Sequence, residues 1–229
     1  WAKEAGVKYY QSENWHTAGS AFLTGYERNE REKLIDSAFS KFNEVFGFYP
    51  TSVGAWWIDS HSLDYMQKKY AVTAALIVSD QYTTDNYQIW GQYFGPPYYP
   101  AKNNALHPAS SLENKLPVVM MQWASRDPVN GYGDGVEQST FSIQANDYIN
   151  YHNLNTDYFS ALVDIYTKQQ FNKFGHLVVG LENSYSWEKY GKEYENQITV
   201  LADKQKNGEF RIVSLKDFSS WYTNRFPGL

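Results

Sequence analysis

Acidic and amide side chains follow several apolar segments of this chain, at the point where each segment ends. In the clearest case Asp59 follows AWWI, residues 55–58. The same arrangement recurs four times: Asp80 and Gln81 follow LIVS, Arg126 and Asp127 follow MMQWAS, Asp147 follows FSIQAN, and Glu182 follows LVVGL. Carboxyl groups brought together in pairs perform acid–base and nucleophilic chemistry. Recurrence of the pattern predicts that several of these groups converge on one site.

Three of these acids also have a purely structural interpretation. Glu182 would be a strand-end acid bonded to a neighbouring Arg or Tyr. Asp59 and Ser60 stand directly before a helical pattern, so either side chain would satisfy the first amides of a helix as an N-cap. Asp127 lies beside Arg126, which is typical of a local ion pair. From the residues alone both interpretations stay open.

The elements that must position these groups alternate between helix and strand. Apolar spacing predicts a helix over 27–46, ended by Gly47, and shorter or later helices over 62–70, 156–174 and 186–206. Continuous apolar runs predict strands over 53–58, 71–78, 116–124, 176–182 and 209–215, before a final helix. Such alternation favours a parallel sheet covered by helices, with sites at the carboxyl ends of its strands.

Aromatic residues make up 18% of the chain, with eight Trp, 20 Tyr and 13 Phe, although the mean hydropathy is only −0.60. Many rings therefore lie beside polar residues, as in the Pro- and Gly-rich segment 91–104 and in the loop 125–139. Rings of this kind stack on the apolar faces of sugars, and the alternative is that each loop packs its own rings. The predicted substrate-binding residues are Trp56, Trp57, Asp80, Gln81, Trp90, Tyr98, Tyr99, Trp123, Arg126, Asp147 and Trp187.

Charge and composition exclude several other classes of protein. The formal net charge is −5 with a pI of about 5.5, and the 20 Lys and Arg are scattered, which argues against a nucleic-acid partner. No segment approaches the apolar length that spans a bilayer. The absence of cysteine excludes disulfides, thiolate zinc sites and cysteine nucleophiles.

The five histidines show no metal-binding spacing, because no two are three or four residues apart. His61 lies two residues beyond Asp59, and His16 would have to approach it across the mouth of a barrel. The two predictions for a cofactor are therefore none, or a single zinc ion held by His16 and His61.

The segment GFYPTSVGAWWIDSHSLDYMQKKYAVTAALIVSDQ resembles the nucleophile strand shared by glycoside hydrolase family 57 and the α-mannosidases of family 38. This resemblance places Asp59 at the nucleophile position. The later segment GLENSYSW is similar to a family 57 motif in which Glu182 matches a glutamate. Gly180 stands where that family keeps its catalytic aspartate, so the resemblance leaves Glu182, Asp127 and Asp80 as candidates for the acid/base.

The upstream segment ENWHTAGSAFLTGYERNEREKLIDSAFSKFNEVFGFYP resembles NodB-type polysaccharide deacetylases. His16 and Thr17 match the first metal-binding pair of those enzymes, whereas Ser20 occupies the second histidine position. The resemblance extends from about Glu13 to Trp221. It implies an irregular seven-stranded (β/α) barrel, with a first strand and its paired acids expected before Trp1.

Together these observations predict one carbohydrate-active (β/α) barrel domain over residues 1–229. The favoured function is retaining hydrolysis of a polysaccharide or glycan, with Asp59 as nucleophile and Glu182 or Asp127 as acid/base. The alternatives are a metal-dependent polysaccharide deacetylase and a non-catalytic, glycan-binding or structural barrel of a larger surface protein. We expect an extracellular or cell-surface location, a carbohydrate partner, and further chain or domains before residue 1.

Overall fold

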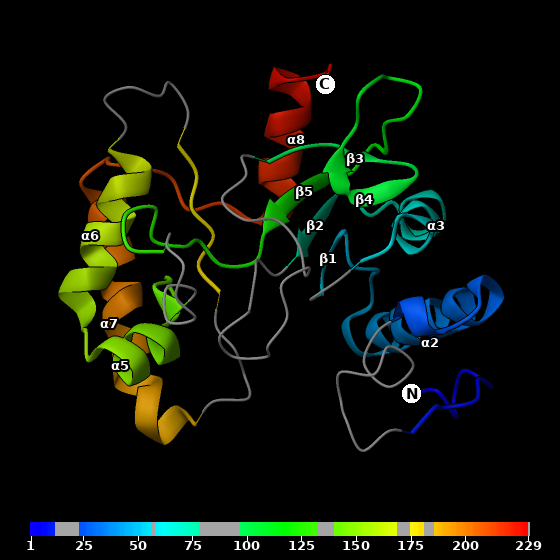
Figure 1. The fold of residues 1–229 in the computed structure, drawn as a ribbon, viewed down its shortest axis with the longest axis horizontal. Coiled ribbons are helices and arrows are strands. Elements are labelled where there is room, and N and C mark those ends of the chain that lie inside the picture. Colours follow the sequence, from blue (N-terminus) through cyan, green and yellow to red (C-terminus); the bar gives the residue numbers. More distant parts are fainter. Residues whose placement is uncertain are drawn as a thin grey trace. The chain divides into compact units, whose positions relative to one another are not determined.

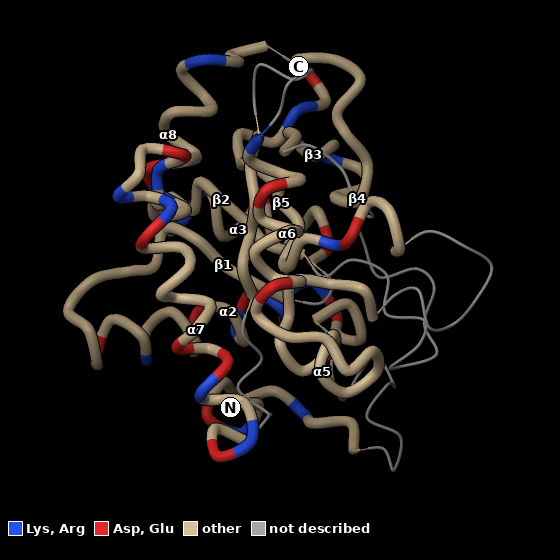
Figure 2. The backbone as a smooth tube through the Cα atoms, turned by 90° about the vertical axis from the view of Figure 1, so that its left-hand side faces the viewer, with Lys and Arg blue, Asp and Glu red and all other residues tan. Residues whose placement is uncertain are grey.

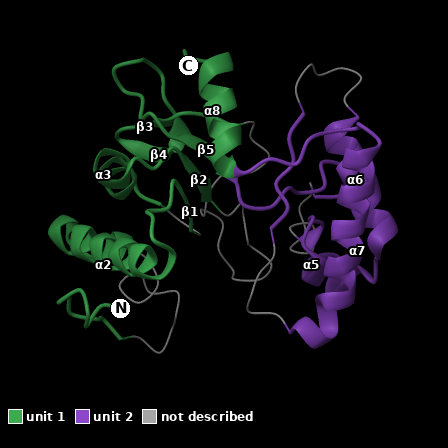
Figure 3. Cartoon of the chain, turned by 180° about the vertical axis from the view of Figure 1, so that it is seen from behind, with its two compact units in different colours: residues 1–77, 97–121, 215–229 green, residues 78–96, 122–214 purple. Residues whose placement is uncertain are grey.

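The computed structural model describes residues 1–11, 23–55, 58–77, 97–131, 140–168, 175–180 and 186–228 (Figure 1). The chain divides into two compact units, coloured separately in Figure 3. Unit 1 comprises 1–77, 97–121 and 215–229, and unit 2 comprises 78–96 and 122–214. The single-domain expectation for 1–229 stays a prediction.

Unit 1 is built on a three-stranded sheet in the order β1 (Ser52–Ala55), β2 (Ala74–Ile77) and β5 (Val119–Gln122). Strands β1 and β2 are parallel, with Ser52 opposite Ala74 and Ala55 opposite Ile77. Every residue of β2 and β5 is buried, as expected for strands covered on both faces.

Two helices of unit 1 flank the strand-to-helix connection that carries Asp59: α2 (Arg28–Phe46) and α3 (Ser60–Tyr70). Helix α2 begins with a capping box between Glu27 and Glu30 and ends at Gly47, whose φ of 77° is the left-handed conformation that glycine adopts freely. A short 3-10 helix, η1 (Leu23–Gly25), precedes α2.

A carboxylate on α2 fastens this helix to α3. Asp36 accepts hydrogen bonds from the hydroxyls of Tyr65 and Tyr70, at 2.9 and 2.6 Å, and from Lys69 Nζ at 2.7 Å. Burial acts to raise the pKa of Asp36, but these three donors outweigh it and lower the pKa below its ordinary value. The contact therefore holds the two helices together most strongly when the carboxylate is charged.

The rest of unit 1 consists of a small antiparallel pair and the C-terminal helix. Strands β3 (Pro100–Ala101) and β4 (Asn104–Pro108) form the pair, and α8 (Leu215–Arg225) lies against β2. The Tyr99 hydroxyl donates to the Phe226 carbonyl at 2.7 Å, which joins the chain after α8 to the segment leading into β3.

Unit 2 is a group of helices, α5 (Ala145–His152), α6 (Thr156–Thr167) and α7 (Trp187–Lys206). Their apolar faces meet around residues that are almost completely buried, such as Tyr148, Phe159 and Leu162. Glu193 on α7 accepts hydrogen bonds from the Tyr148 hydroxyl at 2.6 Å and the Thr156 hydroxyl at 2.8 Å. One carboxylate thus connects all three helices.

The described residues confirm a mixed α/β fold, and they correct several strand predictions. Residues 175–180 and 209–214 form no strand, and the apolar segment before Asp147 leads into α5. Among the described residues the sheets have three and two strands, so a seven-stranded barrel is not shown. The pair β3–β4 and helix α5 were not predicted.

Lys and Arg are interspersed with Asp and Glu along the described chain (Figure 2). None of the helices in the described part of the chain is both long enough and apolar enough to cross a membrane.

Candidate functional site

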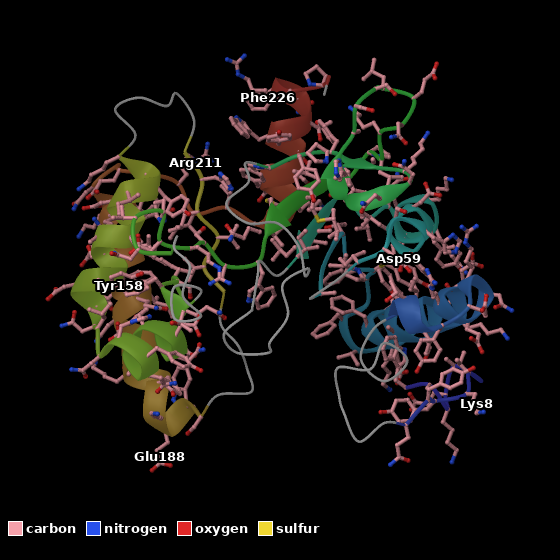
Figure 4. All side chains as sticks on the ribbon, in the orientation of Figure 1. Lys8, Asp59, Tyr158, Glu188, Arg211 and Phe226 are labelled. Atoms are coloured by element: carbon pink, nitrogen blue, oxygen red, sulfur yellow. The ribbon has the colours of Figure 1, made fainter. Side chains whose placement is uncertain are left out.

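Asp59 is the N-cap of α3, on the short connection after β1 (Figure 4). Its Oδ1 accepts the Ser62 amide at 2.9 Å, and its Oδ2 accepts the Ser62 hydroxyl at 2.6 Å. The sequence-based prediction of a cap at this position is therefore confirmed. A cap does not exclude a second role, because each carboxylate oxygen has two lone pairs.

Arg31 on α2 completes the surroundings of Asp59, and sequence reasoning did not find it. Its Nη1 donates to Asp59 Oδ1 at 3.0 Å, while its Nε donates to the Tyr26 carbonyl at 2.7 Å. The side chains of Arg31 and Asp59 are only 18% and 14% exposed. Oδ1 is thus held by the guanidinium and a backbone amide, whereas the one donor to Oδ2 among the described residues is the Ser62 hydroxyl.

Several predicted site residues lie outside the described part of the chain. They are His16, Trp56, Trp57, Asp80, Gln81, Trp90 and Glu182. Their predicted roles stay predictions, and so does the convergence of the strand-end acids on one site. Asp59 belongs to unit 1, whereas Asp127 and Asp147 belong to unit 2.

Asp127 is buried in unit 2, with both carboxylate oxygens occupied. Oδ1 accepts the amides of Val129 and Asn130, at 2.8 and 3.0 Å, in a turn closed by its own side chain. Oδ2 accepts the Asn130 side-chain amide at 2.8 Å and the hydroxyl of Tyr158, a residue of α6, at 3.1 Å. Burial, together with the nearby Asp127 charge, raises the pKa of Tyr158, which keeps its hydroxyl a donor. This arrangement suits a structural carboxylate better than one that exchanges protons with a substrate.

Asp147 at the start of α5 is also buried and tied to its own segment. It accepts hydrogen bonds from the Ser142 hydroxyl at 2.6 Å, the Asn146 side chain at 2.9 Å and the Gln144 side chain at 3.2 Å. Arg126 is buried as well, and its carbonyl accepts the Tyr166 hydroxyl at 2.6 Å. The ion pair between Arg126 and Asp127 stays a prediction.

The indole of Trp123 lies flat across Gly180. A Cβ built on Gly180 would lie 2.7 Å from Trp123 Nε1 and 3.1 Å from both of the ring carbons bonded to that nitrogen. Because the three distances are so similar, the Cβ would meet the face of the ring, not its edge. Gly180 is the position at which the family 57 resemblance expects an aspartate, and here the indole occupies the space that such a side chain would need.

Of the predicted aromatic ligands that lie in the described ranges, only Trp187 is strongly exposed. Tyr98 and Tyr99 are buried in unit 1, where their hydroxyls donate to the carbonyls of Ala105 and Phe226. Burial raises the pKa of Tyr98 above its ordinary value. These rings pack into the fold, as the alternative interpretation of their loop expected, while Trp187 on α7 is 63% exposed.

Of the two predicted zinc ligands, His16 lies outside the described residues and His61 lies within them. The Nε2 atom of His61 lies 3.1 Å from Oε1 of Glu32 on α2. Within the described ranges no group of three His, Asp or Glu side chains is placed to hold a metal ion. The zinc site stays a prediction that depends on His16.

One solved structure has a fold similar to that of this chain. The chain superposes on a crystal structure from Parabacteroides distasonis, a proposed glycoside hydrolase/deacetylase, with a TM-score of 0.68 at 14% sequence identity. The match covers 88% of this chain and 49% of that protein, so the chain spans about half of its length. At this level of identity the similarity shows a shared fold.

A family model matches nearly the whole sequence of this chain. The family described as "Domain of Unknown Function with solved-structure structure (DUF3863)" matches residues 11–228, and the chain belongs to this family. A search of the curated proteins finds no match.

Proposed function

We propose that this chain is a carbohydrate-active domain that hydrolyses a polysaccharide or glycan with retention of configuration. In this proposal Asp59 is the nucleophile and Glu182 is the acid/base. The domain acts on its substrate outside the cell or at the cell surface. The fold shared with a proposed glycoside hydrolase/deacetylase supports the substrate class.

The hydrogen bonds of Asp59 support its choice as the nucleophile. A carboxylate that attacks an anomeric carbon must be oriented through one oxygen and present the other. At Asp59, Arg31 and the Ser62 amide hold Oδ1, while Oδ2 accepts a single hydroxyl that can rotate away. Asp127 lacks this asymmetry, because amide and hydroxyl donors occupy both of its oxygens.

The proposed reaction has two steps. Oδ2 of Asp59 attacks the anomeric carbon as the glycosidic bond breaks, and the leaving oxygen takes a proton from Glu182. Water, deprotonated by Glu182, then attacks the same carbon and releases Asp59. Assigning the acid/base to Glu182 leaves Asp127 in its buried turn.

The variant Asp59→Asn tests this proposal. Asparagine caps helices about as well as aspartate, so the variant keeps the start of α3 while losing the nucleophile. On a panel of chromogenic glycosides we expect the variant to lose at least about a thousandfold in kcat. Asp64→Asn, on the exposed surface of the same helix, is the matched control and should retain full turnover. Unchanged turnover of Asp59→Asn would overturn the mechanism.

A non-catalytic, glycan-binding domain is the second candidate, and the contact of Trp123 with Gly180 favours it. An aspartate at position 180 would have to displace the indole. If wild-type protein binds polysaccharide but turns over no glycoside or acetylated sugar, this candidate replaces hydrolysis.

A further inference from the structure

Trp187 is an exposed residue of unit 2 whose indole packs against a glycine of its own helix. It is the first residue of α7, beside Glu188, which Figure 4 labels. A Cβ built on Gly191 would lie 2.7, 2.8 and 2.9 Å from Cε2, Nε1 and Cδ2 of Trp187. These similar distances place the ring face against the backbone of the next helical turn.

The orientation of the ring leaves its other face to solvent. Gly191 is buried beneath the indole, whereas the Trp187 side chain is 63% exposed. On the helix side Tyr194 lies with its ring centroid 6.0 Å from that of Trp187. The indole is therefore supported from below and beside, and it presents a flat, fixed apolar face.

Polar residues follow Trp187 along α7. Glu188 and Lys189 are exposed, and Lys192 pairs with Glu195 one turn further on. Lys189 Nζ and the Tyr190 hydroxyl both donate to Asn150 Oδ1, at 2.8 and 2.7 Å. A single open ring among hydrogen-bonding groups matches the face of a sugar, which presents C–H groups surrounded by hydroxyls.

The surface at the end of α2 makes a useful contrast. There Val45, Phe46, Phe48 and Tyr49 are all exposed and adjacent, and Phe42 packs among them. Such a continuous apolar surface is typical of contacts with another protein. The isolated ring of Trp187 does not have that character.

We propose that Trp187 is a stacking platform for a pyranose residue of a glycan chain, fixed in place by Gly191. The inference rests on the proposed function for its ligand class, but not on catalysis by Asp59. The platform is built entirely from residues of unit 2, whereas Asp59 belongs to unit 1.

Affinity electrophoresis tests the platform, with each gel containing one soluble polysaccharide: starch, laminarin, mannan, xylan or glycol chitin. Wild-type protein should be retarded in at least one gel. Trp187→Ala should weaken that apparent affinity roughly three- to tenfold, the range expected for one aromatic contact. Trp221→Ala, which removes an exposed indole from α8 in unit 1, is the matched control and should bind like wild type.

A second variant separates ring placement from folding. Gly191→Ala keeps the indole and favours the helix, but its Cβ displaces the Trp187 ring from its position over residue 191. We expect it to weaken binding while leaving the melting temperature equal or higher. Hydrolysis is measured on small chromogenic glycosides and the platform by retardation in polysaccharide gels, so loss of hydrolysis and loss of the platform are distinguishable. Equal retardation of wild type and Trp187→Ala, or no retardation of wild type in any gel, would contradict the proposal.

Discussion

Arg31 Nη1 lies 3.0 Å from Asp59 Oδ1, and this ion pair joins the first turn of α2 to the start of α3. The same guanidinium also donates to the carbonyls of Tyr26 and Thr24 ahead of α2. One side chain therefore fixes both the path of the chain into α2 and the orientation of the proposed nucleophile.

Replacing Arg31 by Met should destabilise the protein. The substitution removes three hydrogen bonds and leaves the poorly exposed Asp59 without its cation, so we expect a loss of about 2 kcal/mol in the free energy of unfolding. Urea denaturation of the wild type and the variant measures this difference in the free energy of unfolding. Lys41→Met is the control, because its pair with Glu44 is exposed and should contribute little to stability. Similar losses for both variants would contradict the anchoring role of Arg31.

Adding a methyl group at Gly180 should also destabilise the protein. The Cβ would lie 2.7 Å from Trp123 Nε1, so Gly180→Ala should cost roughly 1–3 kcal/mol through overpacking. Gly228→Ala, where no atom lies within 4 Å of the added Cβ, should have little effect. Replacing Trp123 by Leu should restore part of the loss in a double variant. A neutral Gly180→Ala would mean that the ring is not held there.

Stability should fall as the pH decreases from about 6.5 to about 4. Burial lowers the pKa of His176 from 6.5 to about 4, so over this range the unfolded chain binds a proton that the folded chain does not. The contribution of neutral His176 is complete above pH 6.5. It is lost progressively as the pH falls toward 4.

The variant His176→Gln should flatten this part of the stability profile, as measured by urea denaturation at several pH values. Asp36 and Asp164 do not confuse the result, because their pKa values are lowered below 3.8 and their contributions are lost only at more acidic pH. An unchanged slope in His176→Gln would contradict the assignment.

Most helices of this fold were predictable from sequence, whereas α5 and the irregular segments were not. The apolar spacing before Gly47 identified α2 almost to the residue, because it reflects burial of one helix face. The apolar segment at 209–215 resembled a strand, yet Ile212 and Val213 are exposed and unpaired by any sheet in the described structure. Apolar composition alone does not reveal whether a segment finds a neighbouring strand.

The site was predictable only in part. A cap or a catalytic acid at Asp59 could be inferred from the strand-to-helix transition, whereas Arg31 lies 28 residues earlier and carries no local signal. The spacing of Trp187 and Gly191, one helical turn apart, was visible in the sequence. The face-on contact between them depends on a side-chain rotamer, which the sequence does not specify.

The most direct test of the central claim is to trap the glycosyl–enzyme intermediate. The protein is incubated with an activated 2-deoxy-2-fluoro glycoside of a sugar it releases, and the labelled peptide is identified by mass spectrometry. We predict one added fluoroglycosyl group on Asp59 and none in Asp59→Asn. Turnover without any label, a label on another residue, or no turnover of any glycoside would contradict Asp59 as the nucleophile.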